Sequence, residues 1–197
     1  MSDPLERWPL ADRYDVRDTL AAAYADPSRG YHDTLHLTEV LDRLDELAAS
    51  GLAFDATAGT LAAWFHDAVY DGERDAEERS AVWAEEALAG TTYAEEVARL
   101  VRLTETHDPA DDDLAGQALC DADLAILAAP QERYDAYVAG VRLDYSHISD
   151  ADFATGRAAV LHDLARRSEL FHTAYGREHW DAAARANLER ELQSLVG

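Results

Sequence analysis

The chain has 197 residues, and its 40 acidic residues against 17 arginines and no lysine give a formal charge of −23. Apolar residues make up 48% of the sequence, a globular proportion that excludes wholesale disorder, and the length suits a single domain. So negative a chain without any basic run is unsuited to nucleic-acid polymers or anionic membranes, which leaves small molecules, cations and proteins as partners.

No run of apolar residues approaches the roughly 18 that a membrane span needs, and the first residues show no signal-peptide pattern. The single cysteine, Cys120, excludes an internal disulfide and suits a reducing compartment. We therefore expect a cytoplasmic protein in which Cys120 is an inert buried thiol.

Apolar residues recur at steps of three and four along nearly the whole chain, as Leu37, Leu41 and Leu44 illustrate. Clusters of Gly, Pro and Asp separate the periodic segments, and no alternating run is long enough for a strand. The sequence therefore predicts one all-α domain of eight or nine helices over residues 1–197. The expected helices span residues 10–25, 34–50, 55–72, 75–88, 93–106, 113–129, 131–145, 150–170 and 177–195.

The positions of the histidines indicate a metal site. His32 and His36 lie four residues apart in YHDTLH and share a helical face, whereas His66 and Asp67 end the apolar run TLAAWFHD. The His-Asp dipeptide occurs four times in this acidic chain, so only its context distinguishes one copy. The pair at 66–67 follows a buried helix, where polar side chains require partners. Imidazoles and carboxylates are the usual ligands of divalent metals.

The order YHDTLH, then WFHDAVYDG with EERSA, then LCDADLAIL resembles the HD superfamily of metal-dependent phosphohydrolases. The later segments GRAAVLHDLARR and FHTAY are similar to a bacterial branch of predicted phosphohydrolases. The resemblance implies a single HD-type helical domain. Its metal-binding core lies at about residues 30–127, and the C-terminal helices of residues 131–197 pack on it.

The resemblance also implies a ligand set for one divalent ion, which could be Mn, Mg, Co, Ni, Zn or Fe. His36 matches the first ligand, and His66 and Asp67 match the His-Asp pair. Asp123 fits the last ligand, with Asp121 as second choice. These two are about 200° apart on a helix, so only one of them should face the metal. The alternative is a structural cluster of buried polar groups.

Further residues receive expected catalytic roles from the same resemblance. Asp67 would orient a water beside the metal, and His32 would protonate the leaving group. The carboxylate of Asp33 beside His32 favours an acid over a base, although His32 could also be a surface residue at a helix start. His107 is expected in the active site, or else as a C-terminal helix cap.

A phosphate substrate also needs positive charge and an ordered water. Glu78, in preference to Glu77, would order a metal-bound water, unless both are simply acids that favour a helix dipole. Arg142 and Arg157 are the expected phosphate contacts, and Arg166 and Arg167 are further candidates. Ordinary ion pairs with surface carboxylates are the alternative for every arginine.

The expected activity is divalent-metal-dependent hydrolysis of a phosphoester or phosphoanhydride in a small phosphorylated substrate, with a nucleotide as the leading class. One alternative is a non-catalytic sensor that binds metal or nucleotide. A less favoured alternative is an HD-type di-iron oxygenase. Such a site typically needs two more histidines between the His-Asp pair at 66–67 and the final aspartate, and that interval contains only His107. The amphipathic C-terminal helix could pack within the chain or against a second subunit, so a homodimer is an alternative.

Overall fold

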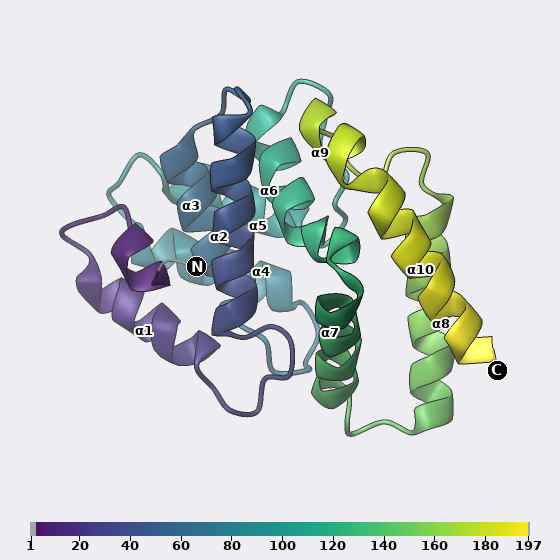
Figure 1. Cartoon of the computed structure of the whole chain (residues 1–197). Helices are drawn as coiled ribbons and strands as arrows, with labels where there is room; N and C mark the ends of the chain where they lie inside the picture. The colour runs from purple at the N-terminus through teal and green to yellow at the C-terminus, as the bar shows by residue number, and fades with distance from the viewer. Residues whose placement is uncertain (1–2, 197) are drawn as a thin grey trace.

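The computed structural model describes residues 3–196, which form ten α-helices and two short 3-10 helices without a strand (Figure 1). Nine of the ten α-helices have seven residues or more, so the all-α prediction is confirmed. None of the described helices combines the length and apolar character needed to cross a membrane. In chain order the elements are η1 (Pro4–Arg7), α1 (Tyr14–Tyr24), α2 (Thr34–Ala49), α3 (Ala56–Phe65), α4 (Ala76–Ala87), α5 (Ala94–Leu103), α6 (Leu114–Leu124), η2 (Ala125–Ala128), α7 (Gln131–Asp144), α8 (Asp150–Arg166), α9 (Ala174–His179) and α10 (Asp181–Val196).

Short polar side chains determine where several helices begin. A side-chain oxygen at the N-cap accepts hydrogen bonds from the free amides of the first turn, which a helix cannot satisfy by itself. Asp33 caps α2 by accepting from the amides of Leu35 and His36. Asp55 caps α3, Asp113 caps α6 and Ser149 caps α8 in the same way. Four of the nine predicted helix starts follow from these caps.

Several helix ends differ from the prediction, and one of these differences creates the functional site. The helix expected over residues 55–72 ends at Phe65, because the amides that follow find other acceptors. The Asp67 amide donates to the Tyr24 hydroxyl at 3.3 Å, and the Val69 amide donates to the Ser80 hydroxyl at 3.0 Å. The segments expected at 113–129 and 177–195 are likewise divided, into α6 with η2 and into α9 with α10.

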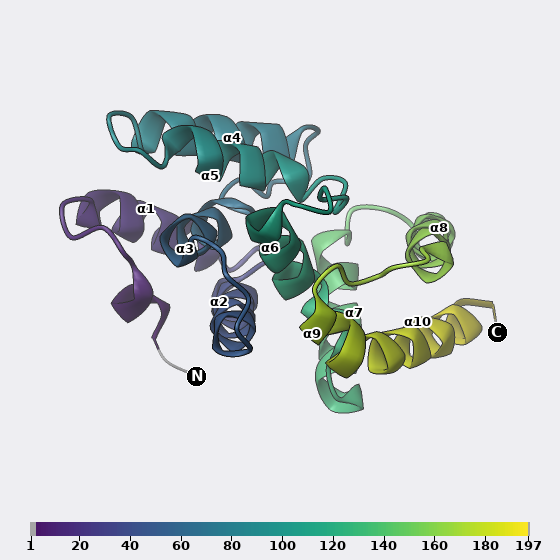
Figure 2. The same ribbon diagram turned by 90° about the horizontal axis from the view of Figure 1, so that it is seen from above.

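The helices form three groups around one core (Figure 2). Helices α2, α3 and α6 pack on one another in the centre, and α5 packs against α3 and α6 with α4 beside it. On the other side lie α7 to α10. Trp64, Phe65 and Leu41 are fully buried at the centre of this arrangement. Burial of such side chains contributes roughly 1.5–3 kcal/mol each to folding.

A buried polar network connects the last helices to one another. Arg157 on α8 donates from Nε and Nη2 to both carboxylate oxygens of Glu191 on α10, at 2.7 and 3.1 Å. Tyr134 on α7 donates to the same carboxylate at 2.6 Å, and Tyr137 accepts from Arg157 at 2.9 Å. The side chains of Arg157 and Glu191 are only 8% and 3% exposed, so each charge depends on the other.

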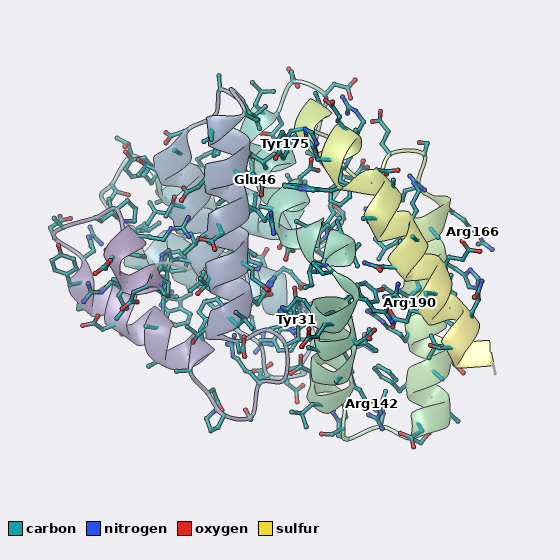
Figure 3. All side chains as sticks on the ribbon, viewed as in Figure 1. Tyr31, Glu46, Arg142, Arg166, Tyr175 and Arg190 are labelled. Carbon is teal, nitrogen blue, oxygen red and sulfur yellow. The ribbon has the colours of Figure 1, made fainter. Side chains whose placement is uncertain are left out.

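The C-terminal helices are also attached to the rest of the molecule by side chains seen in Figure 3. Tyr175 on α9 donates to Glu46 on α2 at 2.6 Å. Arg190 on α10 lies over the Tyr134 ring of α7, with 5.4 Å from its guanidinium carbon to the ring centroid. Helix α10 therefore fixes both α7 and α8 relative to the core.

Replacing Glu191 with alanine should lower the free energy of unfolding by about 3–5 kcal/mol, because the Arg157 charge would remain buried without its partner. Thermal and urea unfolding followed by circular dichroism would measure this loss. Glu189→Ala is the matched control on the exposed side of the same helix, and it should change stability by less than about 0.5 kcal/mol. Equal effects of the two substitutions would contradict the assigned role.

Candidate metal centre

Two histidines and two aspartates from three helices bring their side-chain atoms together. The Nε2 atoms of His36 and His66 are 3.0 Å apart, and Asp67 Oδ2 lies 3.3 and 3.0 Å from them. Asp123 Oδ1 approaches the same two nitrogens at 3.2 and 3.6 Å. Both imidazoles are buried, and the side chains of the two carboxylates are about one-sixth exposed.

The helix ends place these four groups. His36 lies in the capped first turn of α2, His66 and Asp67 directly follow the last residue of α3, and Asp123 lies at the end of α6. The Nδ1 atom of His66 donates to the Ala63 carbonyl at 2.8 Å. This hydrogen bond orients the ring and leaves Nε2 as the atom directed into the cluster, which is the usual support for a metal-binding histidine.

The spacing of the donor atoms suits a small divalent cation. Metal–nitrogen and metal–oxygen bonds of about 2.0–2.2 Å place neighbouring donors roughly 3.0–3.4 Å apart, for angles between 90° and the tetrahedral value. The His36, His66 and Asp67 atoms fall within this range. These three residues could therefore hold a metal ion.

The cluster also has the electrostatic character of a cation site. Burial disfavours charge on His36 and His66, but the carboxylates of Asp67 and Asp123 outweigh it and raise the pKa of both imidazoles. Burial likewise opposes ionisation of the two aspartates, yet the histidines hold the pKa of each carboxyl well below its usual range. Two fixed carboxylates thus attract positive charge, which protons or a metal ion can supply.

A cleft of about 780 Å³ opens beside the cluster, flanked by α7 and α8. Asp67 and Asp123 reach it from the cluster, and His32 and His107 lie in its wall. A volume of this size is typical of a site for a small organic ligand. The structure therefore brings His32 and His107, both expected in the site, to the same cavity as the metal-binding candidates.

His32 is paired with a carboxylate that the sequence analysis missed. Its Nδ1 atom donates to Asp144 Oδ2 at 2.9 Å, and the ring stacks on Tyr70 with 3.8 Å between centroids. Burial opposes ionisation of Asp144, but the hydrogen bonds from His32 and the Gly30 amide outweigh it and lower the pKa of this carboxyl. Asp33, the neighbour expected to act on His32, instead caps α2.

The loop that carries His32 is fixed by two further residues that the sequence analysis missed. Arg29 donates to the carbonyls of His32, Asp67 and Ala68 at 2.8 to 3.0 Å, which ties this loop to the loop after α3. At Gly30 a side-chain Cβ would lie only 2.1 Å from the Gly140 carbonyl oxygen. This contact between the backbones at Gly30 and Gly140 on α7 brings Asp144 close to His32. Hydrophobic periodicity in the sequence does not predict such a contact.

His107 lies at the outer oxygen of Asp123. Its Nε2 atom is 2.8 Å from Asp123 Oδ2, while Asp123 Oδ1 faces the two buried histidines. The backbone of His107 has a φ of 50°, in the left-handed region that non-glycine residues rarely adopt. Arg167 and His172 each hydrogen-bond to its carbonyl and hold this conformation.

Asp121 and Glu78 have other partners. Both oxygens of Asp121 accept from backbone amides, those of His172 and Thr173, at 2.7 and 2.8 Å. Asp121, the second choice for the last ligand, thus holds the chain before α9. Glu78 forms an exposed bidentate ion pair with Arg102, and it is Glu77 that lines the cleft.

Three of the four arginines expected at a phosphate are engaged with protein oxygens. Arg157 lines the cleft, but it is committed to Glu191 and Tyr137. Arg142 lies at the far end of α7, where it donates to Asp150 and to the carbonyls of Tyr145 and Ile148 (Figure 3). Arg166 projects from the outer side of α8, and Arg167 binds the loop of His107. Their phosphate role stays a prediction.

No protein-family model, curated protein or solved structure gives a significant match to the chain. The resemblance to the HD superfamily is therefore carried by the motif residues of the sequence alone.

Replacing His66 with alanine should abolish metal binding, because it removes one of the three donors and the Ala63 contact that orients it. Titration with Mn²⁺ followed by calorimetry and elemental analysis would show one ion per wild-type chain and none in the variant. His162→Ala, an exposed histidine on α8, is the control and should bind the metal normally. A helical His66→Ala protein that retains wild-type affinity would contradict the assignment.

Metal affinity should increase with pH. The two carboxylates raise the pKa of His36 and His66 above the ordinary 6.5, so these imidazoles hold their protons to a higher pH than free histidine. A metal ion must displace those protons, so the apparent Kd should rise by up to about tenfold per displaced proton for each pH unit of acidification. Calorimetry in buffers of different ionisation enthalpy would count the protons released. A Kd that does not vary with pH would contradict this expectation.

Proposed function

We propose that this protein is a divalent-metal-dependent hydrolase of the HD superfamily that cleaves a phosphoester or phosphoanhydride in a small molecule. The observation that carries the proposal is the grouping of His36, His66, Asp67 and Asp123 at the inner end of an open cleft, with His32 in the same wall. A purely structural polar cluster would not need two carboxylates that line an open cleft.

These four residues would hold a divalent metal, which when bound would supply a water of lowered pKa and polarise a phosphoryl oxygen. Asp67 lines the cleft and would orient the attacking water. That water forms a new oxygen–phosphorus bond as the bond from phosphorus to the leaving oxygen breaks. His32 gives its proton to the leaving oxygen and regains a proton from the water. A phosphomonoester would yield an alcohol and inorganic phosphate, and a phosphoanhydride would yield two phosphate products.

Asp144 is the positioning residue for His32 in this proposal. It fixes Nδ1 as the hydrogen-bonded atom of the ring, so Nε2 is the atom that can face a substrate in the cleft. The same hydrogen bond holds the ring in one orientation beside the cleft, which a general acid requires. The role assigned to His32 therefore has a structural basis outside its own motif.

Replacing His32 with alanine should slow the hydrolysis of phosphate esters with poor leaving groups by about 10²–10⁴-fold, the usual contribution of a general acid. An activated ester such as 4-nitrophenyl phosphate should be much less affected, because its leaving group needs no proton. Asp144→Asn should show the same pattern with a smaller loss. Steady-state kinetics with Mn²⁺, Mg²⁺, Co²⁺, Ni²⁺ and Zn²⁺ would provide these values.

Metal content measured on the same preparations separates the possible explanations. His32→Ala should retain the metal, whereas His66→Ala should lose both the metal and the activity. Equal losses for the activated and the poor esters would contradict the acid role of His32. Binding of metal and nucleotide without turnover of any ester would instead support the non-catalytic sensor.

A further inference from the structure

The outer part of the cleft is apolar. Beyond the metal centre, its walls come mainly from η2, from α7 and α8, and from the turn that joins α7 to α8. Val160 and Tyr145 remain 52% and 41% exposed there, although both belong to a wall that a ligand could cover. The apolar and aromatic wall residues are Leu124, Ile126, Leu127, Tyr137, Val141, Tyr145, Ile148, Phe153, Val160 and Leu164.

A phosphoryl group alone would fill only a small part of about 780 Å³. The rest of a bound substrate must therefore lie against these walls. Apolar walls stabilise an aromatic or aliphatic group by removing it from water, whereas they leave the hydroxyl groups of a sugar or polyol without partners. The walls thus favour a substrate whose non-phosphate part is apolar.

The charges of the cleft limit the phosphate part. Besides the metal-centre residues Asp67 and Asp123, the lining includes the acids Glu77, Glu105 and Asp163. Among the described residues it includes two arginines, and each is already paired: Arg157 with Glu191, and Arg167 with Asp163 at 3.3 Å. Its two histidines are paired as well, His32 with Asp144 and His107 with Asp123. No described arginine in the lining is left to neutralise a second or third phosphate. Each added phosphate would face Glu77 and Glu105, which form no ion pair among the described residues.

One neutral donor is available beside the metal centre. Tyr31 is 6% exposed and lines the cleft, and its hydroxyl has no hydrogen-bond partner among the described residues. The ring packs against His36 and Tyr137, with 4.6 Å between centroids in each pair. A buried hydroxyl without a partner is costly, and a phosphoryl oxygen at the metal centre could satisfy it without adding charge.

We infer that the substrate is a monophosphate ester with an apolar aromatic or aliphatic body, which places its single phosphate at the metal centre and its body between α7 and α8. This inference rests on the proposed function and narrows it. It assigns the cleft to esters that carry one phosphate and separates them from nucleoside di- and triphosphates, which carry more charge than the lining can neutralise.

The first experiment compares esters of equal charge and similar leaving groups. 3-Phenylpropyl phosphate and glycerol 3-phosphate are both primary alkyl esters, and they differ in the polarity of the body. With Mn²⁺-loaded protein, kcat/KM should be at least about tenfold higher for the phenylpropyl ester. Val160→Asn should reduce this preference about tenfold. Val82→Asn is the matched control, because Val82 is a 40% exposed valine on α4 outside the cleft lining, and it should leave the preference unchanged.

The second experiment varies the charge at a fixed body. 3-Phenylpropyl mono-, di- and triphosphate are compared at constant free Mn²⁺, and kcat/KM should fall by about tenfold or more from the mono- to the triphosphate. A triphosphate that is turned over as well as the monophosphate, or a glycerol ester preferred to the phenylpropyl ester, overturns the inference.

Equilibrium binding distinguishes failure of the inference from failure of the proposed function. Calorimetry measures the Kd of both alkyl esters with Mn²⁺-loaded protein, whether or not they are hydrolysed. Tighter binding of the phenylpropyl ester that Val160→Asn weakens, in the absence of turnover, rejects the hydrolase and supports the assignment of the cleft. Equal binding of the two esters, or no effect of Val160→Asn, rejects the assignment even if hydrolysis occurs.

Discussion

The burial of two imidazoles and two carboxylates at one point is the constraint on which the rest of the structure depends. Any one of these groups would be unfavourable in the core by several kcal/mol if it were charged and alone. His36, His66, Asp67 and Asp123 are tolerated because each lies beside an opposite partial or full charge. Helices α2, α3 and α6 must therefore meet at this point. The packing of the central helices and the placement of the charges consequently depend on each other.

The same constraint explains the distribution of arginine in so acidic a chain. The arginines closest to the site bind protein oxygens: Arg29 joins the two loops beside the cluster, Arg157 neutralises Glu191, and Arg167 holds the unusual backbone of His107. Arginine suits these tasks because its planar group donates several hydrogen bonds in fixed directions. In the proposed enzyme the metal would supply the positive charge that substrate binding needs, since the side chains of the cleft leave little of it free.

The C-terminal helices determine what the metal centre faces. Helix α8 is held mainly by α10, through the Arg157–Glu191 pair and the apolar contacts around it, and Tyr134 and Tyr137 connect α7 to the same pair. Directional hydrogen bonds can hold α7 and α8 in place without close apolar packing between them. Apolar side chains such as Val160 consequently stay exposed along a cleft, and exposure of this kind commonly marks a binding site.

The sequence by itself determined the helical class, most helix starts and the identity of the metal-binding candidates, because these depend on local periodicity, on capping side chains such as Asp33, and on the order of the motifs. It did not reveal the end of α3 at Phe65. That end depends on the hydroxyl groups of Tyr24 and Ser80, which lie elsewhere in the chain and accept hydrogen bonds from the amides that follow the helix. Nor did it reveal Asp144, which is 112 residues from its partner His32 and reaches it only where Gly30 and Gly140 allow two backbones to touch. The motif favoured Asp123 over Asp121, but only the tertiary structure shows their different partners, His107 for Asp123 and the amides before α9 for Asp121, because those partners come from distant segments.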